Sequence, residues 1–149
     1  MLRKISLIFL LLFFSACTAG SSKWQDYQIL LLKYSDQTIE PTRIITVDFQ
    51  GTLRVRSDNQ EEITYPLAQA QLKKIEQVLK QQNFWSFAVE GSLPTDSQKI
   101  VTVATVTAKN EQESEAWVTS AACNNVCSDE LDAIILSVLD LTDQAQLKQ

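Results

Sequence analysis

The sequence contains no histidine among its 149 residues. Without histidine, the chain cannot form a Ser-His or Cys-His catalytic pair, use a histidine general base, or hold a metal through imidazole. It has only three glycines (Gly20, Gly51 and Gly91), which are too widely spaced to build a P-loop or a dinucleotide-binding fingerprint. Most familiar enzyme signatures are therefore excluded, and we expect neither a catalytic site nor a cofactor.

A membrane-spanning apolar run is missing from the start of the chain. Residues 5–14 are apolar apart from Ser6, follow Arg3 and Lys4, and precede the small residues Ser15 and Ala16. This order of basic, apolar and small residues is typical of a secretory signal peptide. The run falls well short of the roughly 20 apolar residues that span a bilayer, which disfavours an uncleaved anchor. We expect residues 1–16 to be a signal peptide that is removed on export.

The residues around Cys17 indicate the kind of signal. Phe14-Ser15-Ala16-Cys17 resembles the bacterial lipobox, with Phe14 where Leu is usual. The resemblance implies that Cys17 carries a diacylglycerol, becomes the new N-terminus and is acylated on its amine. Several acyl chains anchor a protein firmly, whereas one binds only marginally. Thr18 rather than aspartate follows, which by analogy with enterobacterial sorting favours the outer membrane, with the domain facing the periplasm. An ordinary signal peptide cut after Ala19 is the alternative.

The chain after the signal suits a single domain. Residues 17–23 are small and polar and predict a lipidated tether, and residues 24–149 are enough to bury a real core. The sequence has 13 basic and 18 acidic residues, and the signal removes only basic ones. An acidic chain without basic clusters argues against nucleic-acid binding and against electrostatic docking on anionic lipid. The predicted contact with the membrane is therefore the N-terminal lipid alone.

The best local signal for structure lies at residues 43–56, where apolar and polar side chains alternate. A three-residue loop at Phe49-Gln50-Gly51 keeps one face of the hairpin apolar, whereas a two-residue loop mixes the faces. The three-residue loop also places Gly51 at the left-handed position of the following bulge. We interpret the arginines of this segment as part of a solvated sheet face rather than as a basic site. The predicted register pairs Val47 with Leu53, Ile45 with Val55, and Thr46 with Arg54.

The remaining segments complete an α+β domain. The apolar run at residues 29–32 predicts a strand buried on both faces, and residues 100–109 and 115–121 predict a second hairpin. Helical spacing of apolar residues predicts a helix at residues 67–84 and a final helix capped by Ser128. We therefore predict an antiparallel β-sheet of about five strands with two helices packed on one face, in the order β-ββ-α-ββ-α.

Cys123 and Cys127 are separated by three residues, between the last predicted strand and helix. Outside the cytosol such a pair is expected to form a disulfide, and the short loop would contribute about 2 kcal/mol by chain entropy. Two other interpretations stay open. One is a redox-active pair, although thiol exchangers generally have two residues between their cysteines rather than three. The C-x3-C spacing also resembles the motif of periplasmic copper-delivery proteins, which add a histidine that this chain lacks.

A turn at Asp48-Phe49-Gln50-Gly51-Thr52, a helix ending in Phe84-Trp85, and a final hairpin and helix occur together in this chain. This pattern is similar to small secreted bacterial domains of unknown function, some of which are proteinase inhibitors. We therefore expect a non-enzymatic envelope lipoprotein that binds an envelope protein, as an inhibitor or accessory subunit, through residues 88–99 or a sheet edge. The alternative is a thiol-redox or soft-metal-handling protein that uses Cys123 and Cys127.

Overall fold

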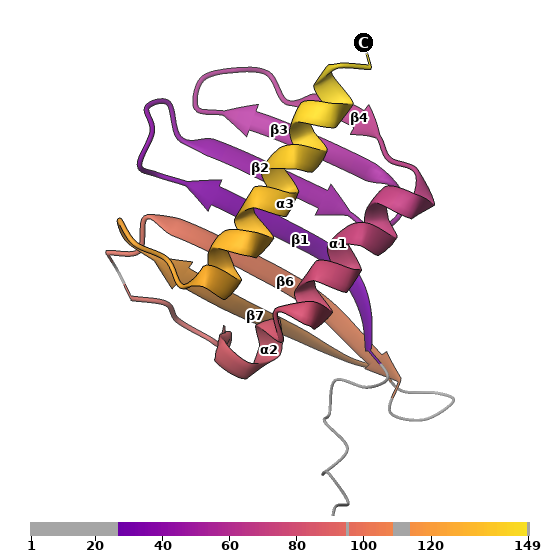
Figure 1. The fold of residues 1–149 in the computed structure, drawn as a ribbon, viewed down its shortest axis with the longest axis vertical. Helices are drawn as coiled ribbons and strands as arrows, with labels where there is room; N and C mark the ends of the chain where they lie inside the picture. Colours follow the sequence, from indigo (N-terminus) through magenta and orange to yellow (C-terminus); the bar gives the residue numbers. More distant parts are fainter. Residues whose placement is uncertain (1–26, 95, 109–113, 149) are drawn as a thin grey trace, which may run out of the picture.

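The computed structural model describes residues 27–94, 96–108 and 114–148. Within these residues the chain forms one antiparallel sheet of seven strands, in the order β4-β3-β2-β1-β6-β7-β5, together with three helices (Figure 1). The strands are β1 (Tyr27–Asp36), β2 (Arg43–Asp48), β3 (Thr52–Ser57), β4 (Ile63–Pro66), β5 (Val89–Glu90), β6 (Lys99–Ala108) and β7 (Ser114–Cys123). The helices are α1 (Gln69–Gln81), α2 (Phe84–Phe87) and α3 (Asp129–Gln146).

The two long helices cross the same face of the sheet side by side (Figure 1). Lys74 of α1 and Asp140 of α3 form an ion pair, with 3.1 Å between Nζ and Oδ2. Both helices turn an apolar stripe toward the sheet, because apolar residues recur at helical spacing along one side of each. The buried stripe residues are Leu72, Ile75 and Leu79 in α1, and Leu131, Ile134, Ile135, Val138 and Leu141 in α3. The core therefore lies between this helical layer and one face of the sheet.

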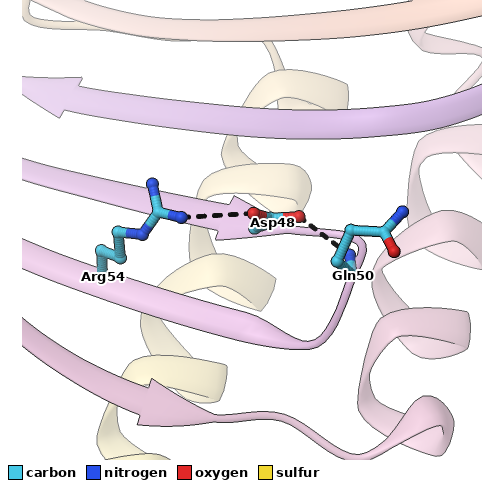
Figure 2. A network of polar contacts seen from close by, with 3 residues as sticks. All are labelled: Asp48, Gln50 and Arg54. Atoms are coloured by element: carbon cyan, nitrogen blue, oxygen red, sulfur yellow. Dashed lines mark hydrogen bonds and ion pairs between the residues drawn. The ribbon is translucent and has the colours of Figure 1, made fainter.

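The β2–β3 hairpin has the register that the sequence predicts. Val47 pairs with Leu53, and Thr46 pairs with Arg54. Asp48 organises the turn: its Oδ1 accepts from the Gln50 backbone N–H over 2.8 Å, and its Oδ2 lies 3.3 Å from Arg54 Nη2 (Figure 2). Gly51 has φ +113°, a conformation that L side chains rarely adopt. The predicted three-residue loop is therefore confirmed.

The α+β class and the antiparallel sheet are also confirmed, but the predicted number of elements is wrong. The described residues contain seven strands rather than five, because β4 and β5 extend the two edges of the sheet. They contain three helices rather than two, because Asn83 adopts a left-handed conformation (φ 50°) and separates α2 from α1. Asparagine tolerates this conformation better than most residues do.

The prediction that residues 29–32 form a strand buried on both faces is also wrong. Ile29 and Leu32 are buried against the helices, whereas Leu30 and Lys33 are exposed. The pairing of β1 with β6 shifts register between Ile29 and Leu31. One solvated face is ordinary for an antiparallel sheet. No helix in the described parts of the chain is long and apolar enough to cross a membrane.

Candidate functional site

A hollow of about 350 Å³ lies where β7, the segment after α2 and the start of α3 meet. Most of the residues that line it have apolar side chains, and none of the described lining residues is charged. Such mostly apolar hollows with a few polar groups are the usual form of binding sites. Its apolar walls include Phe87, Val89, Leu93, Ala121, Val126 and Leu131.

One wall is the segment from Cys123, the last residue of β7, to Cys127, which lies two residues before α3. The structure brings the sulfurs of Cys123 and Cys127 to disulfide distance, with 5.1 Å between their Cα atoms. Two hydrogen bonds tie this loop to the segment before β6. The Gln98 N–H donates to the Cys123 carbonyl over 3.2 Å, and Asn124 Nδ2 donates to Asp96 Oδ2 over 3.3 Å. The cysteine pair therefore joins the two ends of the loop, and the hydrogen bonds fix its first two residues.

The start of α3 forms the next wall, and its cap is the one that the sequence predicts. Ser128 Oγ accepts a hydrogen bond from the Leu131 N–H over 3.3 Å, and the Ser128 carbonyl accepts from the Asp132 N–H over 2.9 Å. Asp129 and Glu130 lie in the first turn, where negative charge complements the helix dipole. Cys127 immediately precedes this cap, so the disulfide and the helix start form one continuous structure.

The opposite wall comes from the segment that the sequence predicts as a loop, residues 88–99. Part of it is a strand: Val89 pairs with Ser120 and Glu90 pairs with Thr119, so β5 lies beside β7. Ser97 is buried, and its N–H donates to the Pro94 carbonyl over 3.2 Å. The prediction of an irregular segment is thus only partly correct, since β5 fixes the side of the hollow next to the sheet.

An aromatic cluster supports this wall from behind. Phe84 is fully buried in the core, and its ring lies 5.6 Å from that of Trp85 and 5.7 Å from that of Phe87. Trp85 in turn packs on Tyr27 at 4.3 Å. Burial, with a smaller effect of the Glu76 charge, raises the pKa of Tyr27 well above its ordinary value. Because Phe84 is anchored in the core, α2 holds Phe87 at the hollow.

The residues that the sequence singles out have different outcomes. Cys17 and the tether at residues 17–23 lie outside the described residues. Cys123 and Cys127 come together as expected, but their proximity is compatible with a structural bond and with a redox role. Within the described ranges, no group of three or more Cys, Asp and Glu side chains is arranged to hold a metal.

A second, smaller hollow of about 220 Å³ lies on the open face of the sheet, where Lys33, Arg54 and Arg56 gather with Glu62. Its charges are mixed, and Arg54 is already paired with Asp48. This agrees with a solvated sheet face. The sequence predicts the loop, the cysteine pair and the Ser128 cap separately. It does not predict that these three features meet around the larger hollow.

No family model and no curated protein matches this chain in sequence. The larger hollow and the disulfide beside it therefore carry the functional inference.

Proposed function

We propose that this protein is a non-enzymatic envelope lipoprotein that binds another envelope protein through the larger hollow, as an inhibitor or accessory subunit. The observation that carries the proposal is the exposed apolar rim of the hollow. Val126 is 87% exposed and Val89 is 46% exposed. Burying such side chains against a partner gains roughly 25 cal/mol for each Å² of apolar surface removed from water.

The fixed shape of the hollow supports binding. The cysteine pair, the Ser128 cap and β5 each hold one wall, so little flexibility is lost when a partner docks. The two serines in the lining already have partners. Ser128 accepts the capping bond, and Ser120 Oγ lies 2.9 Å from Thr102 Oγ1. Their hydroxyls therefore serve the structure, which favours a binding surface over a nucleophile.

The lipobox-like residues before Cys17 support the rest of the proposal. A lipid on Cys17 would anchor the domain in the outer membrane, facing the periplasm, with no contribution from nucleic acid or a cofactor. Mass spectrometry of the mature N-terminal peptide tests this. We expect a peptide that begins at Cys17 and carries acyl chains. An unmodified peptide that begins at Gly20 would show that an ordinary signal peptidase had cut after Ala19.

Photocrosslinking in cells tests the binding surface. A photoreactive residue is placed at Val126, at Val89, or at Leu147, which is 86% exposed and does not line the hollow. We expect the same envelope protein to be captured from Val126 and Val89 but not from Leu147. Equal capture from all three positions, or capture from none, would contradict a docking site at the hollow.

A thiol-redox protein is the second candidate, favoured by the position of Cys127 directly before the α3 cap. A helix N-terminus lowers the pKa of a nearby thiol and so stabilises the thiolate. In exchange, a partner dithiol would be oxidised while this disulfide is reduced to two thiols, which would also be available to a soft metal. The reduction potential discriminates between the candidates, because a value below about −300 mV marks an inert structural bond.

A further inference from the structure

We infer that the smaller hollow, on the open face of the sheet, binds a small organic anion that carries one negative charge on a short apolar chain. Its volume of about 220 Å³ is below the roughly 300–1,000 Å³ that is usual for pockets of drug-sized ligands, so it suits a ligand of a few atoms. This hollow shares no lining residue with the larger one, and the inference does not depend on the proposed function.

The strand register brings three cations to this hollow. Lys33 of β1 pairs with Thr46 of β2, and Thr46 pairs with Arg54 of β3. Arg56 lies on the same face as Arg54, because side chains alternate along a strand. Lys33 and Arg54 are two strand spacings apart, roughly 10 Å, so both long side chains reach an anion placed over Thr46. The hairpin sequence contains the two arginines, but only the sheet adds Lys33 from another strand.

Two of the three cations have no counter-ion. Arg54 Nη2 lies 3.3 Å from Asp48 Oδ2 (Figure 2). In the parts of the chain that the structure describes, neither Lys33 nor Arg56 forms an ion pair or a side-chain hydrogen bond, and neither does Glu62, the carboxylate in the lining. Three cations and two carboxylates leave a net charge of +1. The cluster therefore matches one negative charge, whereas Asp48 and Glu62 would repel the second charge of a dianion.

The rest of the lining suits a short apolar chain and a carboxylate head. Leu31 and Ile44 line the hollow and are only partly buried, so a ligand can cover them. The Thr46 hydroxyl can donate a hydrogen bond, and the guanidinium of Arg56 can hold both oxygens of a carboxylate. A small anion can exchange with the water on this face, so binding is compatible with the solvated face that the sequence predicts.

NMR titration of the isotopically labelled full-length protein in nonionic detergent tests the inference. Hexanoate is the main probe, and acetate, adipate and hexylammonium are its controls. We expect hexanoate to shift the amide signals of residues that line the smaller hollow. It should bind at least about fourfold more tightly than acetate, the gain from burying one methylene group. Adipate, which has a second carboxylate, should bind more weakly than hexanoate, and hexylammonium should not bind at this position.

Matched variants locate the site. Lys33→Gln/Arg56→Gln should weaken hexanoate binding at least about threefold, since it removes two exposed charge interactions. Lys73→Gln/Lys148→Gln changes the net charge equally, but these exposed lysines do not line the hollow, so binding should be unchanged. Glu62→Gln should strengthen binding by up to about fivefold, because it removes one repulsive charge. All five positions are outside the buried core.

Several outcomes would overturn the inference. Hexanoate might shift no signal from this hollow, or the Lys73 and Lys148 variant could lose as much affinity as the Lys33 and Arg56 variant. Equal binding of hexylammonium would show that the hollow does not select negative charge, and tighter binding of adipate would contradict the match to one charge. None of these outcomes bears on the larger hollow, which the crosslinking experiment tests separately.

Discussion

Two buried threonines allow a test of how hydrogen bonding contributes to the stability of this core. Thr105 of β6 is 1% exposed, and its hydroxyl has no hydrogen-bond partner among the described residues. Thr142 of α3 is fully buried, and its hydroxyl donates to the Val138 carbonyl over 2.9 Å. Replacing each with valine exchanges the hydroxyl for a methyl group of similar size. Steric effects are therefore similar at the two sites, and the hydrogen bond is the main difference.

The two substitutions should change stability in opposite directions. An unsatisfied buried polar group costs about 1–3 kcal/mol, whereas a hydrogen bond contributes about 1 kcal/mol net. Thr105→Val should therefore raise the free energy of unfolding by about 1 kcal/mol, because the folded state no longer buries an unpaired hydroxyl. Thr142→Val should lower it by about 1 kcal/mol. Each change corresponds to a shift in Tm of roughly 3–5 °C for a domain of this size.

Urea denaturation of the full-length protein and the two variants, followed by circular dichroism, measures both effects. The slope of the unfolding free energy against urea should be the same in all three proteins, because the exposed surface is unchanged. If Thr105→Val destabilised the protein as much as Thr142→Val does, the Thr105 hydroxyl would be satisfied in solution and the reasoning would be refuted.

Three further predictions concern the turn, the cysteine pair and a surface carboxylate. Gly51→Ala should lower the free energy of unfolding in urea by about 1–2 kcal/mol, because an L side chain is strained at φ +113°. A new Cβ would lie 3.5 Å from the Leu67 carbonyl oxygen, an ordinary contact, so a steric clash adds nothing. An unchanged free energy of unfolding would contradict this prediction. Replacing both Cys123 and Cys127 with serine should lower the free energy of unfolding by about 2 kcal/mol and leave the domain folded. If circular dichroism showed the double variant to be unfolded, the disulfide would contribute more to stability than this. Burial opposes ionisation of Asp36, but hydrogen bonds from Thr38 and the Tyr34 hydroxyl outweigh it and lower the pKa of Asp36. The stabilisation by ionised Asp36 should be fully present above the pKa that Asp36 has in the unfolded chain. It should disappear as the pH falls through the lower pKa that Asp36 has in the folded protein. The stability difference between the protein and Asp36→Asn should therefore vanish in acid, and a difference independent of pH would argue against the shift.

Local patterns explain which parts of the fold were predictable. The β2–β3 register follows from side-chain alternation and a three-residue loop, both of which lie within residues 43–56. The buried stripes of α1 and α3 follow from helical spacing in the same way. The proximity of Cys123 and Cys127 also follows from a short separation in sequence. In each case the interacting residues are neighbours along the chain, so their pattern is visible before folding.

The errors arose where distant segments decide the outcome. β5 has only two residues, and it forms because Val89 and Glu90 meet Ser120 and Thr119 about thirty positions later. The apolar run in β1 does not reveal the register shift between Ile29 and Leu31 in its pairing with β6, or that Leu30 is exposed. Periodicity reports which residues share a face, but it does not report what covers that face.

Several features follow from the sequence alone: the exclusion of histidine chemistry, the α+β class, the central hairpin register and the two apolar helix faces. All of these depend on composition or on neighbours within a few residues. The tertiary structure alone shows that residues 88–99, the cysteine pair and the Ser128 cap meet at one hollow. The reason is that burial depends on distances in space, and the long-range pairing of β5 with β7 brings Val89 beside Ser120.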